Sequence, residues 1–112
     1  DLWVGANEAH YLSNGKIGVL GHIAEFSADG DRHYYSMVFS IDLETGCSTR
    51  PEMIAKRSDF PSGETKRPDL QDVIFSGGLQ RLEDGNARLF AGLSDAEAGF
   101  LDMKDPFLSF EK

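Results

Sequence analysis

Four short stretches carry the polar side chains best placed for chemistry in this 112-residue sequence. In two of them a single residue stands out: His22 lies inside an apolar run, and Asp95 follows the run "FAGLS". An imidazole there could donate a proton or bind an oxyanion. A carboxylate at a strand end could accept hydrogen bonds from a sugar diol through two oxygens. The structural alternatives are a core histidine bonded to a backbone carbonyl and a turn aspartate accepting backbone N–H groups.

The stretches "KRPDLQD" (66–72) and "GANE" (5–8) supply three charged candidates. Arg67 could bind a phosphate or carboxylate through its planar guanidinium. Asp72 could bind a sugar or alter the pKa of a neighbouring group, and Glu8 could be catalytic or only a charge at a strand edge. For 66–72 the alternative is a solvated loop whose ion pairs contribute little. We treat His22, Asp95, Asp72, Arg67 and Glu8 as the candidate substrate-binding residues.

Other familiar site patterns do not occur in the sequence. No His/His or Cys/His pair has the spacing of a transition-metal site, so we predict no metal. Ser76 and Ser94 lack the G-x-S-x-G context of a serine nucleophile. Gly77 and Gly78 are not followed by the helix start and lysine of a phosphate-binding loop. We therefore expect no cofactor, with inorganic phosphate as a possible co-substrate.

The overall charge and composition narrow the class of partner. A formal net charge of -8 and a pI of about 4.7 would repel nucleic acid. No apolar run approaches the ~18 residues of a membrane helix. A single cysteine, Cys47, excludes an internal disulfide and favours a reducing compartment. We expect a cytoplasmic protein that handles small molecules and has neither a nucleic-acid nor a membrane partner.

The elements that would position these residues are strands. Apolar residues alternate with a period of two, which predicts strands over 16–26, 33–43, 53–57, 72–82, 87–94 and 98–103. Asn14-Gly15 and Asp84-Gly85 are typical of two-residue type I′ hairpin loops. No window repeats apolar residues with a helical period for three turns. The sequence therefore predicts an all-β fold.

A weak internal repeat divides the chain into two units. The segments "YLSNGKIGVLGHIA" and "RLEDGNARLFAGLSD" place Gly15 and Gly85 70 positions apart. We predict one meander of strands over 4–57, a connecting loop over 58–70 and a second meander over 71–103. Repeated antiparallel meanders build propeller blades, although a sandwich or an open barrel would give similar local patterns.

The order of four segments resembles a known enzyme group. The chain reads "VLGH", "FSIDLETG", "DVIFSGG" and then "LFAGLSD". This order resembles the C-terminal part of the five-bladed β-propeller carbohydrate enzymes of glycoside hydrolase family 130, over roughly Val4 to Leu101. The residues of these segments resemble still more closely the uncharacterised domain-of-unknown-function family 1861. The resemblance implies that residues 1–112 are about two blades of one five-bladed propeller, and that the chain is a fragment of a longer protein.

The resemblance also implies roles for two candidates. Asp95 matches the aspartate of the family's closing Tyr-Tyr-Gly-Ala-Ala-Asp motif, which contacts the sugar cleaved from the chain. His22 falls at the histidine of the family's Tyr-His-Gly motif, near the phosphate or attacking water, but here Gly21 precedes the histidine instead of following it. Phe90-Ala91 and Ser76-Gly77 replace the family's paired tyrosines and Pro-Cys, so the pocket wall must differ. The family's general acid lies on an earlier blade, and the catalytic residues stay unknown.

The implied function is a glycoside hydrolase or phosphorylase acting on a mannoside-like glycoside. This chain would supply part of the sugar and phosphate pocket, and on its own it would be inactive. Its partners would be a small carbohydrate and the remaining part of the propeller. The alternative is a non-catalytic carbohydrate-binding or assembly module that kept the propeller wall and lost the acid, and a third reading is an unrelated all-β domain.

Overall fold

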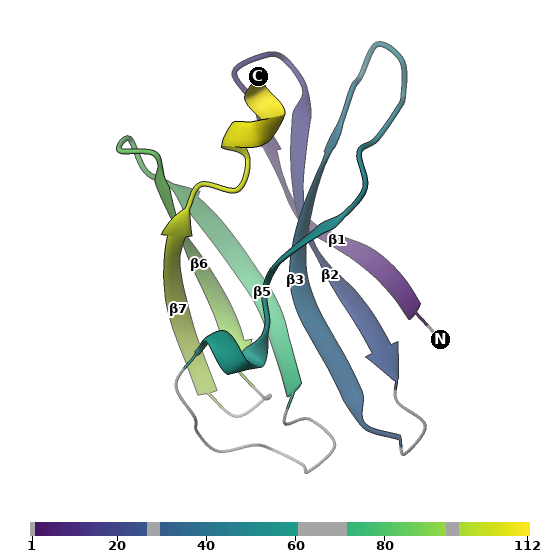
Figure 1. The fold of residues 1–112 in the computed structure, drawn as a ribbon, viewed down its shortest axis with the longest axis vertical. Helices are drawn as coiled ribbons and strands as arrows, with labels where there is room; N and C mark the ends of the chain where they lie inside the picture. The colour runs from purple at the N-terminus through teal and green to yellow at the C-terminus, as the bar shows by residue number, and fades with distance from the viewer. Residues whose placement is uncertain (1, 27–29, 61–71, 94–96) are drawn as a thin grey trace.

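Seven β-strands make up most of the structure, a computed structural model that describes residues 2–26, 30–60, 72–93 and 97–112 (Figure 1). Two short 3₁₀ turns, η1 and η3, accompany the strands. In that part of the chain no helix is long and apolar enough to cross a membrane. The elements are β1 (Leu2–Tyr11), β2 (Ile17–Phe26), β3 (Arg32–Ile41), β4 (Glu52–Ala55), η1 (Arg57–Asp59), β5 (Asp72–Arg81), β6 (Asn86–Leu93), β7 (Glu97–Lys104) and η3 (Leu108–Glu111).

The strands form two antiparallel meanders, as the sequence predicts. The first meander runs β1-β2-β3-β4 and the second runs β5-β6-β7, each strand pairing with the next. A short parallel pairing joins them, with Asp72 and Val73 opposite His33 and Tyr34. Figure 1 shows the meanders side by side, with β5 next to β3. The predicted all-β class is therefore confirmed.

The two predicted hairpin loops lie where expected but are longer than predicted. Leu12 donates its N–H to the carbonyl of Lys16, and Gly15 donates to Leu12, so three residues form the loop. Gly15 has φ +85°, a left-handed conformation that glycine adopts without strain. The second loop repeats this arrangement with Gly85 at φ +84°. A turn followed by one left-handed glycine is the usual three-residue hairpin, so the two-residue type I′ prediction is wrong.

The hydrophobic core lies between the two meanders. Alternate residues of β6 (87, 89, 91 and 93) are all buried, which is the period of a strand with one covered face. Leu20 of β2 lies directly opposite Val38 of β3, and both are fully buried. The core cluster comprises Leu12, Leu20, Val38, Ala55, Phe60, Ile74, Leu79, Ala87, Leu89, Ala91, Leu93 and Phe107. The inner faces of the two meanders therefore hold the fold together by apolar burial.

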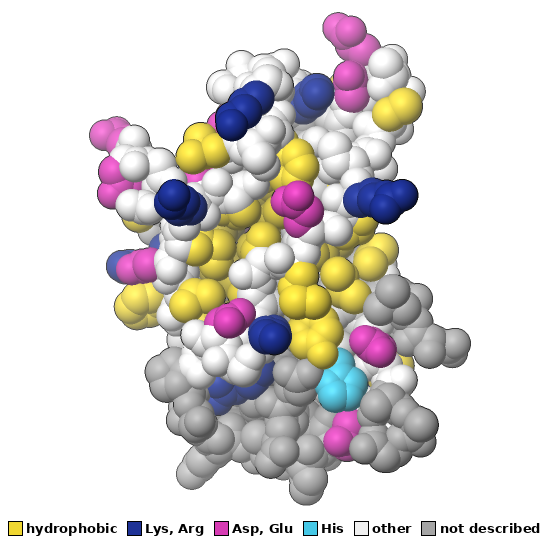
Figure 2. All heavy atoms as spheres, in the orientation of Figure 1, with side chains coloured by type: hydrophobic (Ala, Val, Ile, Leu, Met, Phe, Trp, Pro, Cys, Tyr) yellow, Lys and Arg dark blue, Asp and Glu magenta, His cyan; other side chains and the backbone are white. Residues whose placement is uncertain are grey.

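The first meander is also apolar on its other face, which we call the outer apolar face. The strand registers put four apolar cross-strand rows there: Val4-Ile23-Tyr35, Ala6-Gly21-Met37-Met53, Ala9-Val19-Phe39 and Tyr11-Ile17-Ile41. A fifth row, at the end of β2, carries Glu25 and His33. Val4, Tyr11 and Met53 keep 51%, 87% and 52% of their surface exposed. Figure 2 shows apolar side chains gathered through the middle of one view of the molecule, with acidic and basic side chains among and around them.

An ion-pair cluster ties the meanders together at one end, and we call it the Arg81 clamp (Arg81, Asp105 and Glu111). Arg81 donates to Asp105 Oδ2 at 2.6 Å and to Glu111 Oε1 at 2.5 Å. Glu111 Oε2 also accepts the N–H of Ser13 in the β1–β2 hairpin at 2.6 Å. These contacts, that with Arg81 first, lower the pKa of Glu111 to about 2. In Figure 1 the C-terminal turn accordingly lies beside that hairpin.

The ring of Phe107 fills a hole left by a glycine beside the clamp. Phe107 is fully buried, and a Cβ on Gly18 would lie 2.7 Å from two of its ring carbons. The His10 ring lies on the same aromatic group, with 5.2 Å between centroids. The Arg81 guanidinium is 5.7 Å from the Phe107 centroid. Residues far apart in the sequence therefore complete the packing of the first meander.

Candidate functional site

His22 lies near the middle of β2, half-buried, on the same face as Leu20. Its ring lies against Gly5 of β1, because a Cβ added to Gly5 would be 2.7 Å from His22 Cε1. The Tyr34 ring is nearly parallel to the imidazole, with an interplanar angle of 23° and 6.4 Å between centroids. His22 Nδ1 is 3.1 Å from the side-chain oxygen of Asn7. Glycine, tyrosine and asparagine together define where the imidazole lies.

A β-bulge in β1 brings Asn7 and Glu8 into these positions. The pairing of β1 with β2 shifts between Ala6 and Glu8, which leaves Asn7 as the extra residue. Consecutive residues of a regular strand point to opposite faces, and a bulge breaks that rule locally. Asn7 reaches His22, and Glu8 reaches the backbone of β5. The bulge therefore lets two neighbouring polar residues act on the side of the sheet that faces the second meander.

Glu8, a predicted substrate-binding residue, connects the two meanders. Its Oε1 accepts the N–H of Leu79 at 3.1 Å and lies 2.5 Å from His10 Nε2. A Cβ on Gly78 would be 3.0 Å from Glu8 Oε2, and Gly78 has φ +148°. The carboxylate thus approaches a backbone segment that only glycine accommodates easily. These contacts give Glu8 a bridging role, while its role in substrate binding stays a prediction.

A second bulge, in β5, leaves Gly77 as the extra residue, and the preceding Ser76 contacts the first meander. Ser76 Oγ is 2.7 Å from Ser36 Oγ and donates to the Gly21 carbonyl at 3.3 Å. Ser36 is fully buried and lies directly opposite His22 in the β2–β3 pairing. The stretch "DVIFSGG" is therefore a strand that delivers a hydroxyl to the neighbourhood of His22. Sequence reasoning missed the partner Ser36, although its position among inward-facing residues of a predicted strand was a usable signal.

The remaining candidates are placed only in part. The backbone of Asp72 pairs with His33 where β5 begins, and its side chain lies outside the described part. Arg67 and Asp95 lie outside the described residues altogether. Leu93, the last residue of β6, pairs with Ile74 near the start of β5. The end of β6 and the start of β5 therefore lie at the same end of the second meander. The convergence of His22 and Asp95 on a shared pocket therefore stays a prediction.

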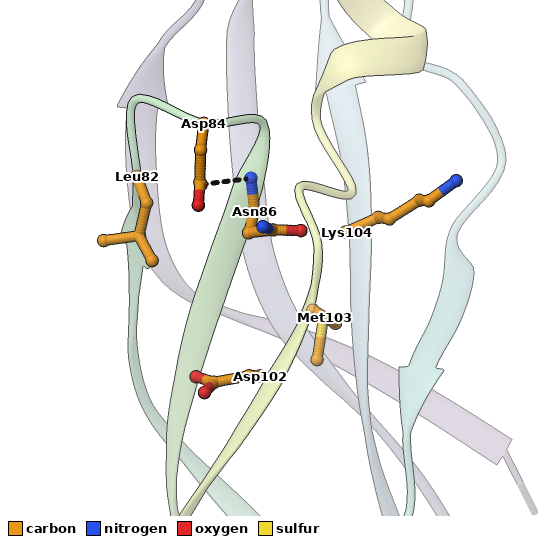
Figure 3. A pocket seen from close by; sticks show the side chains of 6 residues that line it. All are labelled: Leu82, Asp84, Asn86, Asp102, Met103 and Lys104. Atoms are coloured by element: carbon orange, nitrogen blue, oxygen red, sulfur yellow. Dashed lines mark hydrogen bonds between the residues drawn. The ribbon is translucent and has the colours of Figure 1, made fainter.

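A separate shallow cavity of about 370 Å³ lies at the β5–β6 hairpin end of the second meander (Figure 3). Leu82, Asp84, Asn86, Asp102, Met103 and Lys104 line it. Arg88 donates to both Asp102 oxygens, at 2.7 and 3.0 Å, and this pairing lowers the pKa of Asp102. Across the ranges that the structure describes, no three His, Cys, Asp or Glu side chains are grouped to hold a metal ion. None of the sequence-predicted residues lines this cavity, so we centre the candidate site on His22.

Comparisons with family models and with solved structures relate the chain to known proteins. A family model described as "Protein of unknown function (DUF1861)" matches residues 1–109. Among solved structures, a GDP-Man-dependent mannosyltransferase, MPT-1 from Leishmania mexicana, superposes with a TM-score of 0.88 and 28% identity, covering 100% of this chain and 37% of that one. The comparison with curated proteins gives no match.

Two further solved structures show the same extent of similarity. MPT-4, a mannose phosphorylase from Leishmania mexicana in complex with a phosphate ion, has a TM-score of 0.88 and 30% identity, covering 99% of this chain and 36% of that one. A hypothetical protein from Leishmania major has a TM-score of 0.89 and 30% identity, covering 99% and 37%. The chain thus spans little more than a third of the length of these solved proteins.

Proposed function

The chain belongs to the DUF1861 family, as the order of its segments indicated, and on that premise we propose that it forms part of a sugar-binding pocket. The observation that carries the proposal is the superposition of nearly the whole chain on a mannosyltransferase and on a mannose phosphorylase with bound phosphate. Both neighbours are named for mannose chemistry. We infer a glycoside phosphorylase or hydrolase that acts on a mannoside-like substrate, with inorganic phosphate as the co-substrate of phosphorolysis.

The cluster around His22 suits a pocket of this kind. Ligand sites combine apolar or aromatic walls with a few placed polar groups. Here the Tyr34 ring stands beside a half-buried imidazole that Asn7 holds. We assign His22 to a hydroxyl or phosphate oxygen of the ligand. Asp72, Asp95 and Arg67 stay proposed ligand-binding residues, the carboxylates for sugar hydroxyls and the guanidinium for phosphate.

Cleavage of a glycosidic bond needs more than these groups. A carboxylic acid must protonate the leaving oxygen while phosphate or water attacks the sugar. We propose that this acid, which we assign to no residue of the chain, comes from the remaining part of a five-bladed propeller. The outer apolar face supports such a partner, because strands that are apolar on both faces are typical of sheets covered on both faces.

Calorimetric titration tests the function directly. The complete protein that contains these residues is titrated with a β-mannoside and with inorganic phosphate, as wild type and as His22→Ala. Loss of a ligand-bonding imidazole is expected to weaken binding about tenfold, as one hydrogen bond to a ligand is worth roughly 1.5 kcal/mol. Arg88→Ala, on the outer face of the second meander, is the control and should bind as wild type.

Product analysis separates an enzyme from a binding module. Incubation of the complete protein with mannoside and phosphate should release a sugar 1-phosphate, or free sugar if water attacks. Binding without either product would support the non-catalytic carbohydrate-binding alternative. If neither the mannoside nor phosphate binds the complete protein, the proposed function is wrong.

A further inference from the structure

We propose that the outer edge of β7 is an interaction surface for one more β-strand, which a segment outside residues 1–112 of the complete protein supplies. In the described part of the chain, β7 pairs with β6 along one edge and with no strand along the other. Such a strand would complete the second meander whether or not the protein binds a sugar. Its test and the test of the proposed function can therefore fail independently.

The internal repeat shows which element the second meander lacks. β1 begins at Leu2 and β5 at Asp72, the same separation as that of Gly15 and Gly85. The strands β1, β2 and β3 thus correspond to β5, β6 and β7, and β4 (Glu52–Ala55) has no counterpart among the described residues. The blades of a β-propeller are typically sheets of four strands. The second meander is therefore one strand short.

The segment that follows β7 does not fill this position. Phe107 packs over Gly18 of β2, and Glu111 accepts the N–H of Ser13 in the β1–β2 hairpin at 2.6 Å. Figure 1 shows this segment running from β7 toward that hairpin. A fourth strand must therefore come from another part of the protein.

The inner face of β7 is covered less well than that of the equivalent strand β3. Ser36 and Val38 of β3, whose backbones pair with β4, are fully buried. Leu101 and Met103 of β7 also pack against the core, but they are only partly buried, although the β6 residues opposite them are fully buried. A fourth strand with apolar side chains toward the core would cover both residues.

The edge of β7 lacks the features by which proteins protect an exposed strand, such as short length, a bulge or a proline. β4 has four residues and an irregular register, and β1 contains the bulge at Asn7. β7 pairs without a register shift over eight residues (Glu97–Lys104) and contains no proline. Every second residue of such a strand directs its N–H and C=O away from the paired neighbour. These groups form a template for an added strand.

The solved relatives indicate where this strand would come from. The chain covers only 36% or 37% of their lengths, so the complete protein has ample sequence to supply an extended segment. A segment of the same polypeptide is favoured over a second copy, because linkage gives it a high effective concentration at the edge. We expect a segment with alternating apolar residues, which face Leu101 and Met103 when it pairs with β7.

Amide hydrogen exchange of the complete protein, resolved by residue, tests the pairing without any ligand. A strand that is paired on both sides should exchange slowly at every residue from Ala98 to Met103. In an open edge strand every second amide should exchange at least about tenfold faster than its neighbours. β4, the outermost strand of the first meander, is the internal control and should keep fast amides. Alternating fast and slow amides in β7 would overturn the proposal.

Photocrosslinking identifies the occupant of the edge. The variants Phe100→Bpa and Met103→Bpa, where Bpa is the photoreactive p-benzoylphenylalanine, place one probe on each face of β7 in the complete protein. Both should crosslink to the same short peptide outside residues 1–112, within a monomer. Leu43→Bpa, at a 65% exposed residue in the turn after β3, is the matched control and should not label that peptide.

Two crosslinking results would contradict the proposal. Labelling from Phe100 alone would mean that another element packs on the outer face without extending the sheet. Crosslinked dimers would mean that a second copy occupies the edge in place of a segment of the same protein. Sugar binding by the complete protein would be unaffected by either result, so it stays a separate question.

Discussion

The two meanders share one hydrophobic core between their inner faces, but their outer faces differ. On the outer apolar face of the first meander, four of the five cross-strand rows have no charged residue, and the fifth carries Glu25 at the end of the strands. On the outer face of the second, Arg88 pairs with Asp102 across the strands, and Phe90 pairs with Phe100. Arg88 lies 4.3 Å from the Phe100 centroid while it binds Asp102. Alternating polar residues suit a face in water, and a continuous apolar face suits a covered one, so the meanders are built for different surroundings.

The largest loss of unfolding free energy is expected when the Arg81 clamp is broken. Arg81→Ala leaves the carboxylate of Asp105, which is only 3% exposed, without its partner. Removing one member of a buried ion pair costs about 3–5 kcal/mol. Urea unfolding of both proteins should show a loss of that size. Arg88→Ala removes an exposed pair on the outer face of the same meander and should change the unfolding free energy little; equal losses would show that burial does not distinguish the two pairs.

Neighbouring residues of β6 test the inner face against the outer. Leu89 is fully buried in the core, and Phe90 is 43% exposed. Leu89→Ala should lower the free energy of unfolding by about 3 kcal/mol, because it removes buried methyl groups and leaves a cavity. Phe90→Ala should cost clearly less in the same urea titration. A larger effect at Phe90 would mean that the outer face of the second meander is covered.

The pH dependence of stability should report the clamp more strongly than the exposed Arg88–Asp102 pair, whose carboxyl pKa is also lowered. The pKa of Glu111 is lowered to about 2 from 4.5. A lowered folded-state pKa gives stability that is fully present above pH 4.5 and is lost as pH falls toward 2. The unfolding free energy of Glu111→Gln should therefore fall less than that of wild type across this window. Asp102→Asn on the exposed outer face is the comparison, and an equal change in slope would contradict the assignment to Glu111.

Substitution of the two hairpin glycines tests whether the loops of the internal repeat are equivalent. The expected loss of unfolding free energy is smaller here. Gly15 and Gly85 have nearly the same positive φ, with nothing within 4 Å of an added Cβ at Gly15 and only Leu108 Cδ1, at 3.8 Å, at Gly85. A left-handed conformation costs an L-residue about 1 kcal/mol. Gly15→Ala and Gly85→Ala should each lower the unfolding free energy by about that amount in thermal melts. A difference greater than twofold would show that the loops are not equivalent.

The smallest stability effect is expected on the outer apolar face. Met53 is 52% exposed, so Met53→Lys should change the unfolding free energy of the chain by only ~0.5 kcal/mol. Self-association of the chain should nevertheless decrease, because a charge interrupts a row of apolar groups. Light scattering at several concentrations measures this. Equal self-association of Met53→Lys and wild type would contradict the hypothesis that the outer apolar face is covered by another part of the protein.

Period-two patterning predicted six of the strands, but it did not reveal β1. The bulge at Asn7 interrupts the alternation, and the polar residues of "GANEAH" resemble a loop. His22 could be selected from the sequence because a histidine within an apolar run is conspicuous. Its partners Asn7 and Tyr34 could not, because their contacts depend on strand register and ring orientation. Ser36 and Ser76 are 40 positions apart and meet only when the meanders pack.

The Phe107 ring over Gly18 has a consequence for biosynthesis. Residue 18 is synthesised before residue 107. Because chains grow at about 5–20 residues per second, the delay between the two lasts several seconds. Until the later segment emerges, the space over Gly18 lacks the ring that fills it in the folded protein. For several seconds of translation the first meander therefore lacks the ring that covers the apolar surface around Gly18. We expect chaperone binding to this surface to be strongest during that time.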